Sequence, residues 1–144
     1  MFTVCWSPKG GSGTTVVAAS LAILSARHAP TVLVDLGGDA PAALGIGDVG
    51  EAGILDWFGA PHATTDELWR LAVTTTDDLR LIARGDGRDP RTLSSDDWGR
   101  LLTAVADRPD LEVVVDAGAT TPPEDLADVA DQSGAAGAGV RSLL

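Results

Sequence analysis

The chain has 144 residues, of which 44% are hydrophobic and 22% are charged, and its formal net charge is −11. This length and composition suit one domain with a buried core and exclude a disordered chain. The negative charge, without any run of Lys or Arg, argues against nucleic acid and anionic membranes as partners. A single cysteine, Cys5, allows no disulfide within these residues and favours the reducing cytoplasm.

The first part of the chain is predicted to alternate strand and helix. The apolar, β-branched run over 2–6 is typical of a buried strand. Residues 14–28 are predicted as a helix that Pro30 terminates, and we expect it to be buried because it is apolar on most faces. TVLVD, residues 31–35, is a second predicted buried strand, and the glycine-rich segment 36–50 has room for one turn of helix.

The alternation continues further along the chain. It implies a three-layer α/β sandwich, in which a mainly parallel sheet carries helices on both faces. We therefore expect one domain over residues 1–133 and a flexible tail over 134–144, where small residues break the pattern. The further predicted elements are helices over 53–60, 64–72, 94–108 and 120–134 and strands over 79–83 and 111–116.

The last predicted helix has a specific start signal. Thr121 and Glu124 have the spacing of a capping box, in which each side chain bonds to the other residue's backbone N–H. Pro122 suits the first helical position, where no backbone donor is needed. These residues predict a helix that begins directly after Thr121.

A glycine-rich loop, WSPKGGSGTTVV over residues 6–17, connects the first strand to the first helix. The backbone N–H groups of such a loop and the N-terminus of the following helix attract phosphate, which glycines allow to approach closely. Thr15 stands where a hydroxyl would coordinate Mg²⁺, and Lys9 is the one lysine of the chain. The predicted nucleotide-binding residues are Lys9, Gly10, Gly11, Ser12, Gly13, Thr14 and Thr15.

The loop and three strands resemble one family of ATPases. KGGSGTT resembles K-G-G-x-G-K-[ST], the deviant Walker A motif of the ParA/MinD family of bacterial partition and division-site ATPases, which share the CobQ/CobB/MinD/ParA nucleotide-binding domain. TVLVDLGGD resembles the family's second strand, which ends at an Asp in the nucleotide-responsive switch segment, here Asp35. DLRLIARG is similar to its third strand, and LEVVVDAG resembles its Walker B strand, with Asp116 at the Mg²⁺-linked position.

The resemblance implies a shortened P-loop NTPase fold that binds ATP or ADP together with Mg²⁺. Thr15 and Asp116 would hold the metal ion, directly or through water. Lys9 would contact phosphate across the interface of a homodimer, and Lys9 and Asp35 are the catalytic candidates. Both aspartates also have a structural alternative, which is to accept hydrogen bonds from nearby backbone N–H groups.

Three departures from the family pattern affect hydrolysis. Thr14 replaces the P-loop lysine, so a positive charge at the transferring phosphate is lost. The second strand ends in Asp35-Leu36-Gly37, whereas members with strong ATPase activity carry D-x-D there. The family's later strands, which supply base recognition and much of the dimer face, have no counterpart before residue 144. We therefore predict nucleotide binding with weak or absent hydrolysis, and whether the chain is an enzyme stays open.

Two alternatives accompany this hypothesis. One is a non-catalytic interaction module, or a truncated pseudo-ATPase, with the same fold. The other is a Rossmann domain. Gly11-x-Gly13-x-x-Val16 resembles its G-x-G-x-x-G fingerprint with the third glycine absent, and Asp35 follows about 20 residues later, where an acidic residue can hold a ribose. The preferred prediction is a cytoplasmic nucleotide-binding protein in partitioning, positioning or septum-site processes. It would bind nucleotide and an unidentified protein partner, but neither nucleic acid nor membrane.

Overall fold

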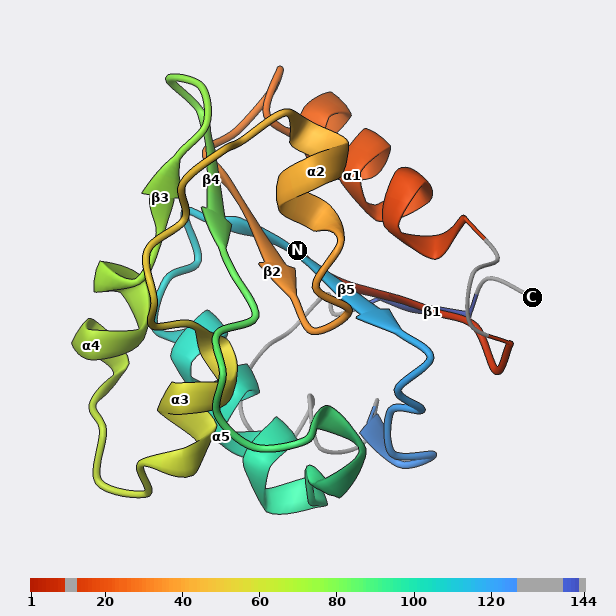
Figure 1. Cartoon of the computed structure of the whole chain (residues 1–144), viewed down its shortest axis with the longest axis vertical. Coiled ribbons are helices and arrows are strands. Elements are labelled where there is room, and N and C mark those ends of the chain that lie inside the picture. The colour runs from red at the N-terminus through yellow and green to blue at the C-terminus, as the bar shows by residue number, and fades with distance from the viewer. Residues whose placement is uncertain (10–12, 127–138, 143–144) are drawn as a thin grey trace.

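The computed structural model describes residues 1–9, 13–126 and 139–142, the last of these by their backbone. Strands and helices alternate along most of this sequence (Figure 1). The helices are α1 (Thr14–Ser25), α2 (Ala40–Leu44), α3 (Ile54–Gly59), α4 (Thr65–Arg70) and α5 (Ser95–Ala106), with a 3-10 turn at Pro90–Thr92. The strands are β1 (Phe2–Trp6), β2 (Thr31–Asp35), β3 (Val73–Thr74), β4 (Leu79–Ile82), β5 (Glu112–Gly118) and β6 (Gly139–Ser142).

The described strands form one six-stranded sheet in the order β3-β4-β2-β5-β1-β6. Every pairing is parallel except that of the short edge strand β3 with β4. β5 therefore lies between β1 and β2, although it follows them in sequence by many residues. This order brings the ends of three strands, which the chain reaches at distant points, to one edge of the sheet.

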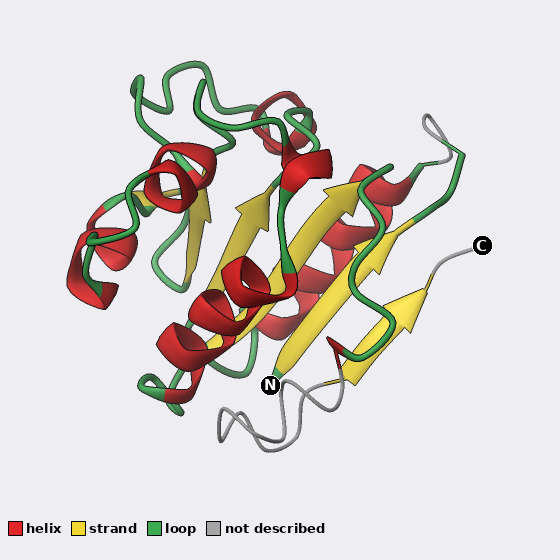
Figure 2. Cartoon of the chain, turned by 90° about the horizontal axis from the view of Figure 1, so that it is seen from below, coloured by secondary structure: helices red, strands yellow, loops and turns green. Residues whose placement is uncertain are grey.

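Helices cover both faces of the sheet (Figure 2). α1 and α2 pack on one face against Leu33 of β2 and Val114 of β5. α3, α4 and α5 pack on the other face against side chains such as Val34 and Val115. Because successive side chains of a strand point to opposite faces, the continuous apolar runs of β2 and β5 supply both cores. The expected α/β architecture with helices on both faces is confirmed.

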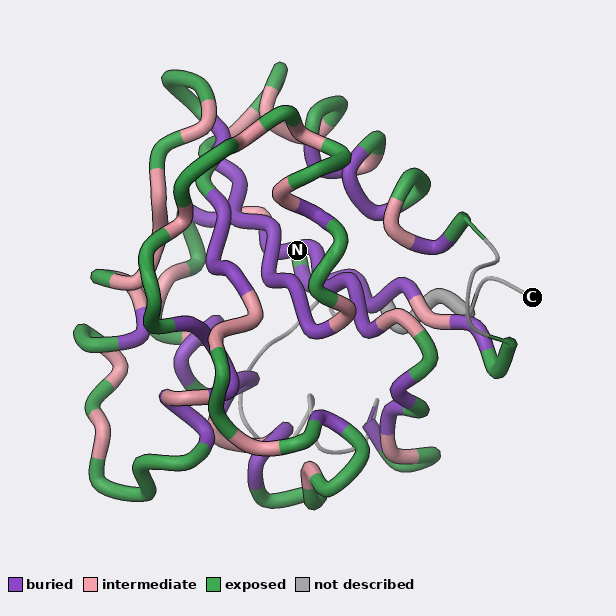
Figure 3. Tube along the Cα trace, viewed as in Figure 1, coloured by how far each residue is buried: buried purple, intermediate pink, exposed green. Residues whose placement is uncertain are grey.

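Helix α1 is buried on one side only, contrary to the expectation that it would be buried as a whole. Ala18 and Ala22 are fully buried against the sheet, but Val16, Ile23 and Leu24 are 64%, 45% and 51% exposed. Figure 3 shows the alternation of buried and exposed residues along this helix. The sheet touches one side of α1, and the described residues provide no further layer outside it.

Several predicted elements differ in extent from those observed. β4 ends at Ile82, one residue earlier than predicted, and β5 continues past Asp116 to Gly118. The extra length of β5 contains a bulge, because Cys5 pairs with Asp116 while Trp6 pairs with Gly118. Helix α1 ends at Ser25, three residues before the predicted end.

The predicted capping box at Thr121 is not formed. Residues 121–125 are not helical, and the first helical residue in this segment is Leu126. A residue that precedes a proline is disfavoured in the helical region, and both Thr121 and Pro122 precede one. Residues 127–134 of the predicted helix lie outside the described part of the chain.

The end of the chain contributes a strand where the sequence predicts a tail. Gly139–Ser142 form β6, which pairs in parallel with β1 at the edge of the sheet. This segment of four residues contains a single apolar residue, Val140, which is too weak a pattern to predict a strand. Among the helices of the described residues, none is long and apolar enough to cross a membrane.

Helix α3 is fixed to the segment that follows β4 through close backbone contact. The backbone N–H groups of Ile54 and Leu55 donate to the carbonyls of Ala83 and Arg84, at 2.9 and 3.0 Å. Gly53 lies so close to this segment that a Cβ atom there would overlap the carbonyl oxygen of Ala83. This packing determines where the chain leaves β4.

We expect Gly53→Ala to lower the free energy of unfolding by about 3 kcal/mol, because the added methyl group forces apart two hydrogen-bonded backbone segments. The matched control is Gly47→Ala, where a Cβ would meet nothing within 4 Å. Urea denaturation followed by tryptophan fluorescence measures both variants. Equal stability of the two variants would contradict the close packing of α3 on this segment.

Candidate functional site

The carboxyl ends of β1, β5 and β2 form the edge of the sheet at which the predicted site residues meet. The chain leaves β1 through α1, which packs on one face, whereas after β5 it reaches Leu126, which belongs to the core of the opposite face. In open α/β sheets, connections that diverge from adjacent strands form a crevice in which ligands bind. The strand order therefore favours this edge as the candidate site.

Asp116 lies at the centre of this edge. Its partners in register are Cys5 on β1 and Asp35 on β2, and its side chain is fully buried. Oδ1 accepts a hydrogen bond from the backbone N–H of Gly118 at 3.0 Å. Oδ2 has no hydrogen-bond partner, although it is buried. Asp116 therefore keeps one buried oxygen without a hydrogen bond, although the Thr15 hydroxyl lies close enough to lower the pKa of this residue.

Burial raises the pKa of Asp116 above its usual value. Interactions with the Thr15 side chain and the Gly118 N–H lower this pKa, while the carboxylate of Asp39 raises it further. Thr15 is thus close enough to Asp116 to influence its ionisation, as the predicted shared metal site requires. A cation at Oδ2 would favour the ionised carboxylate in the same way.

Asp35 is fully buried as well, but both of its oxygens have partners. Oδ1 accepts from the N–H of Gly38 at 2.7 Å and Oδ2 from that of Ala40 at 3.1 Å. Burial nevertheless raises the pKa of Asp35 to about 6, and the nearby Asp116 carboxylate contributes in the same direction. Asp35 thus holds the turn that leads into α2. This is the structural role that the sequence offers as the alternative to a catalytic one.

Two glycines allow the segments after β2 and β5 to approach each other. A Cβ at Gly37 would lie 3.6 Å from both Asp35 Oδ1 and Asp116 Oδ2, so this residue sits directly beside the two carboxylates. Gly118 adopts a positive φ of 55°, and a Cβ there would lie 3.3 Å from the Cα of Gly37. The glycine that breaks the D-x-D pattern is therefore part of the packing at this edge.

The glycine-rich loop is described at its two ends. The Ser7 hydroxyl donates to the carbonyl of Lys9 at 3.1 Å, which fixes the turn after β1, and Lys9 itself is exposed. Gly13 precedes α1 with a φ of 81°, a conformation that favours glycine, and Thr14 is buried. Gly10, Gly11 and Ser12 lie outside the described residues, so their contact with phosphate stays a prediction.

The structure thus brings together Thr15, Asp116 and Asp35, three of the predicted site residues. It adds Ser7, Gly37 and Gly118, which the sequence reasoning did not assign to the site. Ser7 had no distinctive signal, and the roles of the two glycines depend on a contact between segments about 80 residues apart in sequence. Within the described chain, no group of three or more His, Cys, Asp or Glu residues could hold a metal ion alone.

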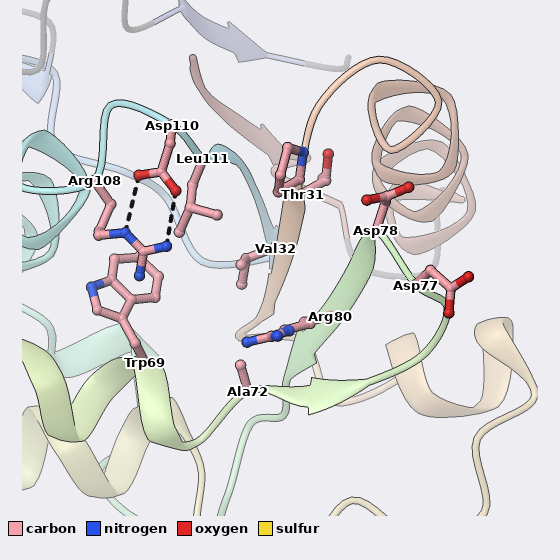
Figure 4. Close-up of a pocket in the computed structure, with 11 residues that line it drawn as sticks. Thr31, Val32, Trp69, Ala72, Asp77, Asp78, Arg80, Arg108, Asp110 and Leu111 are labelled. Atoms are coloured by element: carbon pink, nitrogen blue, oxygen red, sulfur yellow. Dashed lines mark hydrogen bonds and ion pairs between the residues drawn. The ribbon is translucent and has the colours of Figure 1, made fainter.

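Two pockets lie at opposite ends of the sheet. One, of about 330 Å³, opens at the carboxyl ends of β2, β4 and β5. The other, of about 240 Å³, lies at the amino ends of β2 and β5 and includes none of the predicted site residues. Figure 4 shows this second pocket, with the ion pair of Arg108 and Asp110 on one side and Asp77 and Asp78 on the other.

The chain has no match among known families by sequence. No protein-family model matches it, and no curated protein matches it. The geometry of the site and the residues that form it are therefore the basis for a functional proposal.

We expect Asp35→Asn to flatten the dependence of stability on pH. The pKa of Asp35 is 3.8 ordinarily and about 6 in the folded protein, so between these values the folded state binds more protons than the unfolded state. The contribution of Asp35 to the stability of the folded state is full below pH 3.8 and declines as the pH rises towards 6. The unfolding free energy of the variant, relative to the wild type, should rise by about 3 kcal/mol between about pH 4 and about pH 7.

Asp89→Asn is the control for this measurement. Arg91 lowers the pKa of Asp89 from 3.8 to about 2. The contribution of Asp89 to stability is therefore present above pH 3.8 and is lost as the pH falls below that value. Its stability curve should run parallel to that of the wild type over the tested range. Parallel curves for Asp35→Asn as well would show that Asp35 ionises normally in the folded protein.

Proposed function

We propose that the chain is a nucleotide-binding protein of the ParA/MinD type, which holds ATP or ADP with Mg²⁺ in the crevice between β1 and β5 and hydrolyses it slowly or not at all. The observation that carries this proposal is Oδ2 of Asp116, a buried acceptor without a hydrogen-bond partner. An unpartnered buried polar atom costs about 1–3 kcal/mol of stability. A ligand that engages this atom would remove the cost.

Mg²⁺ suits the donors that this edge offers. It is bound through one or two carboxylates together with phosphate oxygens and water, and it rarely has a cage made of protein groups alone. Asp116 and Thr15 supply an acidic and a hydroxyl oxygen, and the described chain holds no cluster of three or more ligating side chains. Mg²⁺, when bound with a nucleotide, would neutralise phosphate charge, and Thr15 and Asp116 are the residues that would hold it.

The phosphate would lie at the N-terminus of α1. This helix has twelve residues, its first turn carries no acidic side chain, and Gly13 precedes it in a left-handed conformation. Unpaired N–H groups at a helix N-terminus carry partial positive charge and bind anions. Lys9 adds the only charged side chain of the predicted loop, and in a homodimer it would reach phosphate across the interface.

Slow hydrolysis follows from two residues. Thr14 offers no positive charge to the transferring phosphate, and preorganised charge there contributes several kcal/mol in related chemistry. Asp35 already accepts two backbone hydrogen bonds, which supports a structural role over the orientation of an attacking water. A role in partitioning, positioning or septum placement, in the cytoplasm and with a protein partner, rests on the family resemblance.

A non-catalytic interaction module is the second candidate function. The outer side of α1 favours it, because Val16, Val17, Ile23 and Leu24 are exposed on a helix that has no charged residue. Exposed apolar patches on soluble domains mark contact surfaces. The Rossmann alternative has less support, since both oxygens of Asp35 are engaged by the backbone of their own turn.

Isothermal titration calorimetry tests the proposal. We expect MgADP to bind, and we expect Asp116→Asn to weaken binding about tenfold in Mg²⁺ but little in EDTA, because the carboxylate acts through the metal ion. The Asn side chain keeps the acceptor that Gly118 needs. Asp48→Asn removes the same charge from an exposed turn and should bind like the wild type.

The absence of heat at high micromolar nucleotide would contradict the proposal and favour the interaction module. Binding that depends equally on Asp116 with and without Mg²⁺ would contradict its role as a metal ligand. These outcomes are read from the ratio of the two dissociation constants, so a general loss of stability in the variant does not mimic the effect.

A further inference from the structure

The pocket at the carboxyl ends of β2, β4 and β5 has a composition unlike that of the rest of the chain. Its volume of about 330 Å³ is in the range of sites for small molecules. Its charged lining residues are Arg84, Arg91 and Asp89, which leave one net positive charge on a chain whose formal net charge is −11. None of the described residues that line it belongs to α1 or to the described ends of the predicted phosphate loop.

Arg84 is held in place through both its backbone and its guanidinium. Its backbone carbonyl accepts from the N–H of Leu55 at 3.0 Å, and its Nη1 donates to the carbonyl of Gly37 at 3.2 Å. Among the described residues it has no carboxylate at ion-pair distance. The nearby Asp89 is bound by Nε and Nη2 of Arg91, at 3.1 and 2.7 Å. Arg84 therefore keeps guanidinium donors that no described acceptor uses.

Thr120, which also lines the pocket, supplies a second donor. Its side chain is 7% exposed, and its backbone N–H donates to the carbonyl of Ala117 at 2.8 Å. Its hydroxyl makes no hydrogen bond with the described residues. A guanidinium and a hydroxyl that line the same pocket are the groups with which proteins bind phosphate and carboxylate oxygens.

We propose that this pocket binds a small oxyanion, the phosphate or carboxylate group of a small molecule, through the Arg84 guanidinium and the Thr120 hydroxyl. This site goes beyond the proposed nucleotide site, because its two proposed donors, Arg84 and Thr120, lie outside the loop over residues 9–15. Its ligand is linked to the buried carboxylates through Arg84, because the guanidinium that would contact the oxyanion also holds the carbonyl of Gly37.

The link to the carboxylates is short. Gly37 lies beside Asp35 and Asp116, and the next residue, Gly38, donates its N–H to Asp35 at 2.7 Å. The aliphatic part of Arg84 also packs on this turn, since a Cβ at Gly38 would lie 3.3 Å from Arg84 Cδ. An oxyanion that draws the guanidinium away from Gly37 therefore shifts the turn that determines the environment of both carboxylates.

NMR titration of the ¹⁵N-labelled protein tests this inference without nucleotide. Inorganic phosphate and acetate are added separately at constant ionic strength, and the amides of Gly37 and Thr120 are followed. We expect saturable shifts with at least one anion, and the stronger ligand identifies the group that the site prefers. Arg84→Gln should weaken binding about tenfold or more, because a charge-assisted hydrogen bond is lost.

Two further variants keep the test decisive. Thr120→Val preserves the side-chain volume and should weaken binding about fivefold through the loss of one neutral hydrogen bond. Arg80→Gln, an exposed residue in the other pocket, removes the same charge and should leave the titration unchanged. The absence of saturable shifts at Gly37 and Thr120 with either anion, or equal affinity in the wild type and both pocket variants, would overturn the inference. Neither result bears on nucleotide binding, since shifts at the phosphate loop are read from Thr14 and Thr15.

Discussion

Burial of two carboxylates side by side is the constraint on which this end of the molecule depends. Asp35 and Asp116 are partners in register on adjacent parallel strands, and neither is exposed. A carboxylate in such surroundings requires hydrogen bonds or a cation to remain ionised. Asp35 obtains hydrogen bonds for both oxygens from one turn, whereas Asp116 obtains one for a single oxygen. The first residue thereby shapes the backbone, whereas the second keeps a buried oxygen without a hydrogen bond.

The turn after β2 connects the features that surround these carboxylates. It donates two N–H groups to Asp35, it packs through Gly37 against Gly118, and its carbonyl at Gly37 accepts from Arg84. The proposed nucleotide crevice and the proposed oxyanion pocket therefore share one backbone segment. Allosteric coupling requires two sites that bias the same element, so coupling between the two proposed sites would run through this turn.

The sequence predicts those features that depend on local pattern. Continuous apolar runs predict the buried strands β1, β2 and β5, and the aspartates at or near the carboxyl ends of two of them are predicted at the binding edge. The strand order depends on contacts between distant residues, so the placement of β5 between β1 and β2 could not be predicted. The same holds for the contact of Gly53 with the segment after β4 and for the two-residue strand β3. The apolar residues on most faces of α1 also overstate its burial, because residue types alone do not show how many layers surround a helix.

Paramagnetic NMR with Mn²⁺ in place of Mg²⁺ most directly tests the claim that the crevice between β1 and β5 holds a metal–nucleotide complex. In the presence of ADP, we predict that Mn²⁺ broadens the amide signals of Thr15, Asp116 and Gly118, while those of Asp78 and Leu111, at the amino ends of the strands, stay sharp. Without ADP the broadening should be much weaker, because phosphate supplies part of the coordination. Sharp signals for Thr15, Asp116 and Gly118 at saturating Mn²⁺ and ADP would contradict the account.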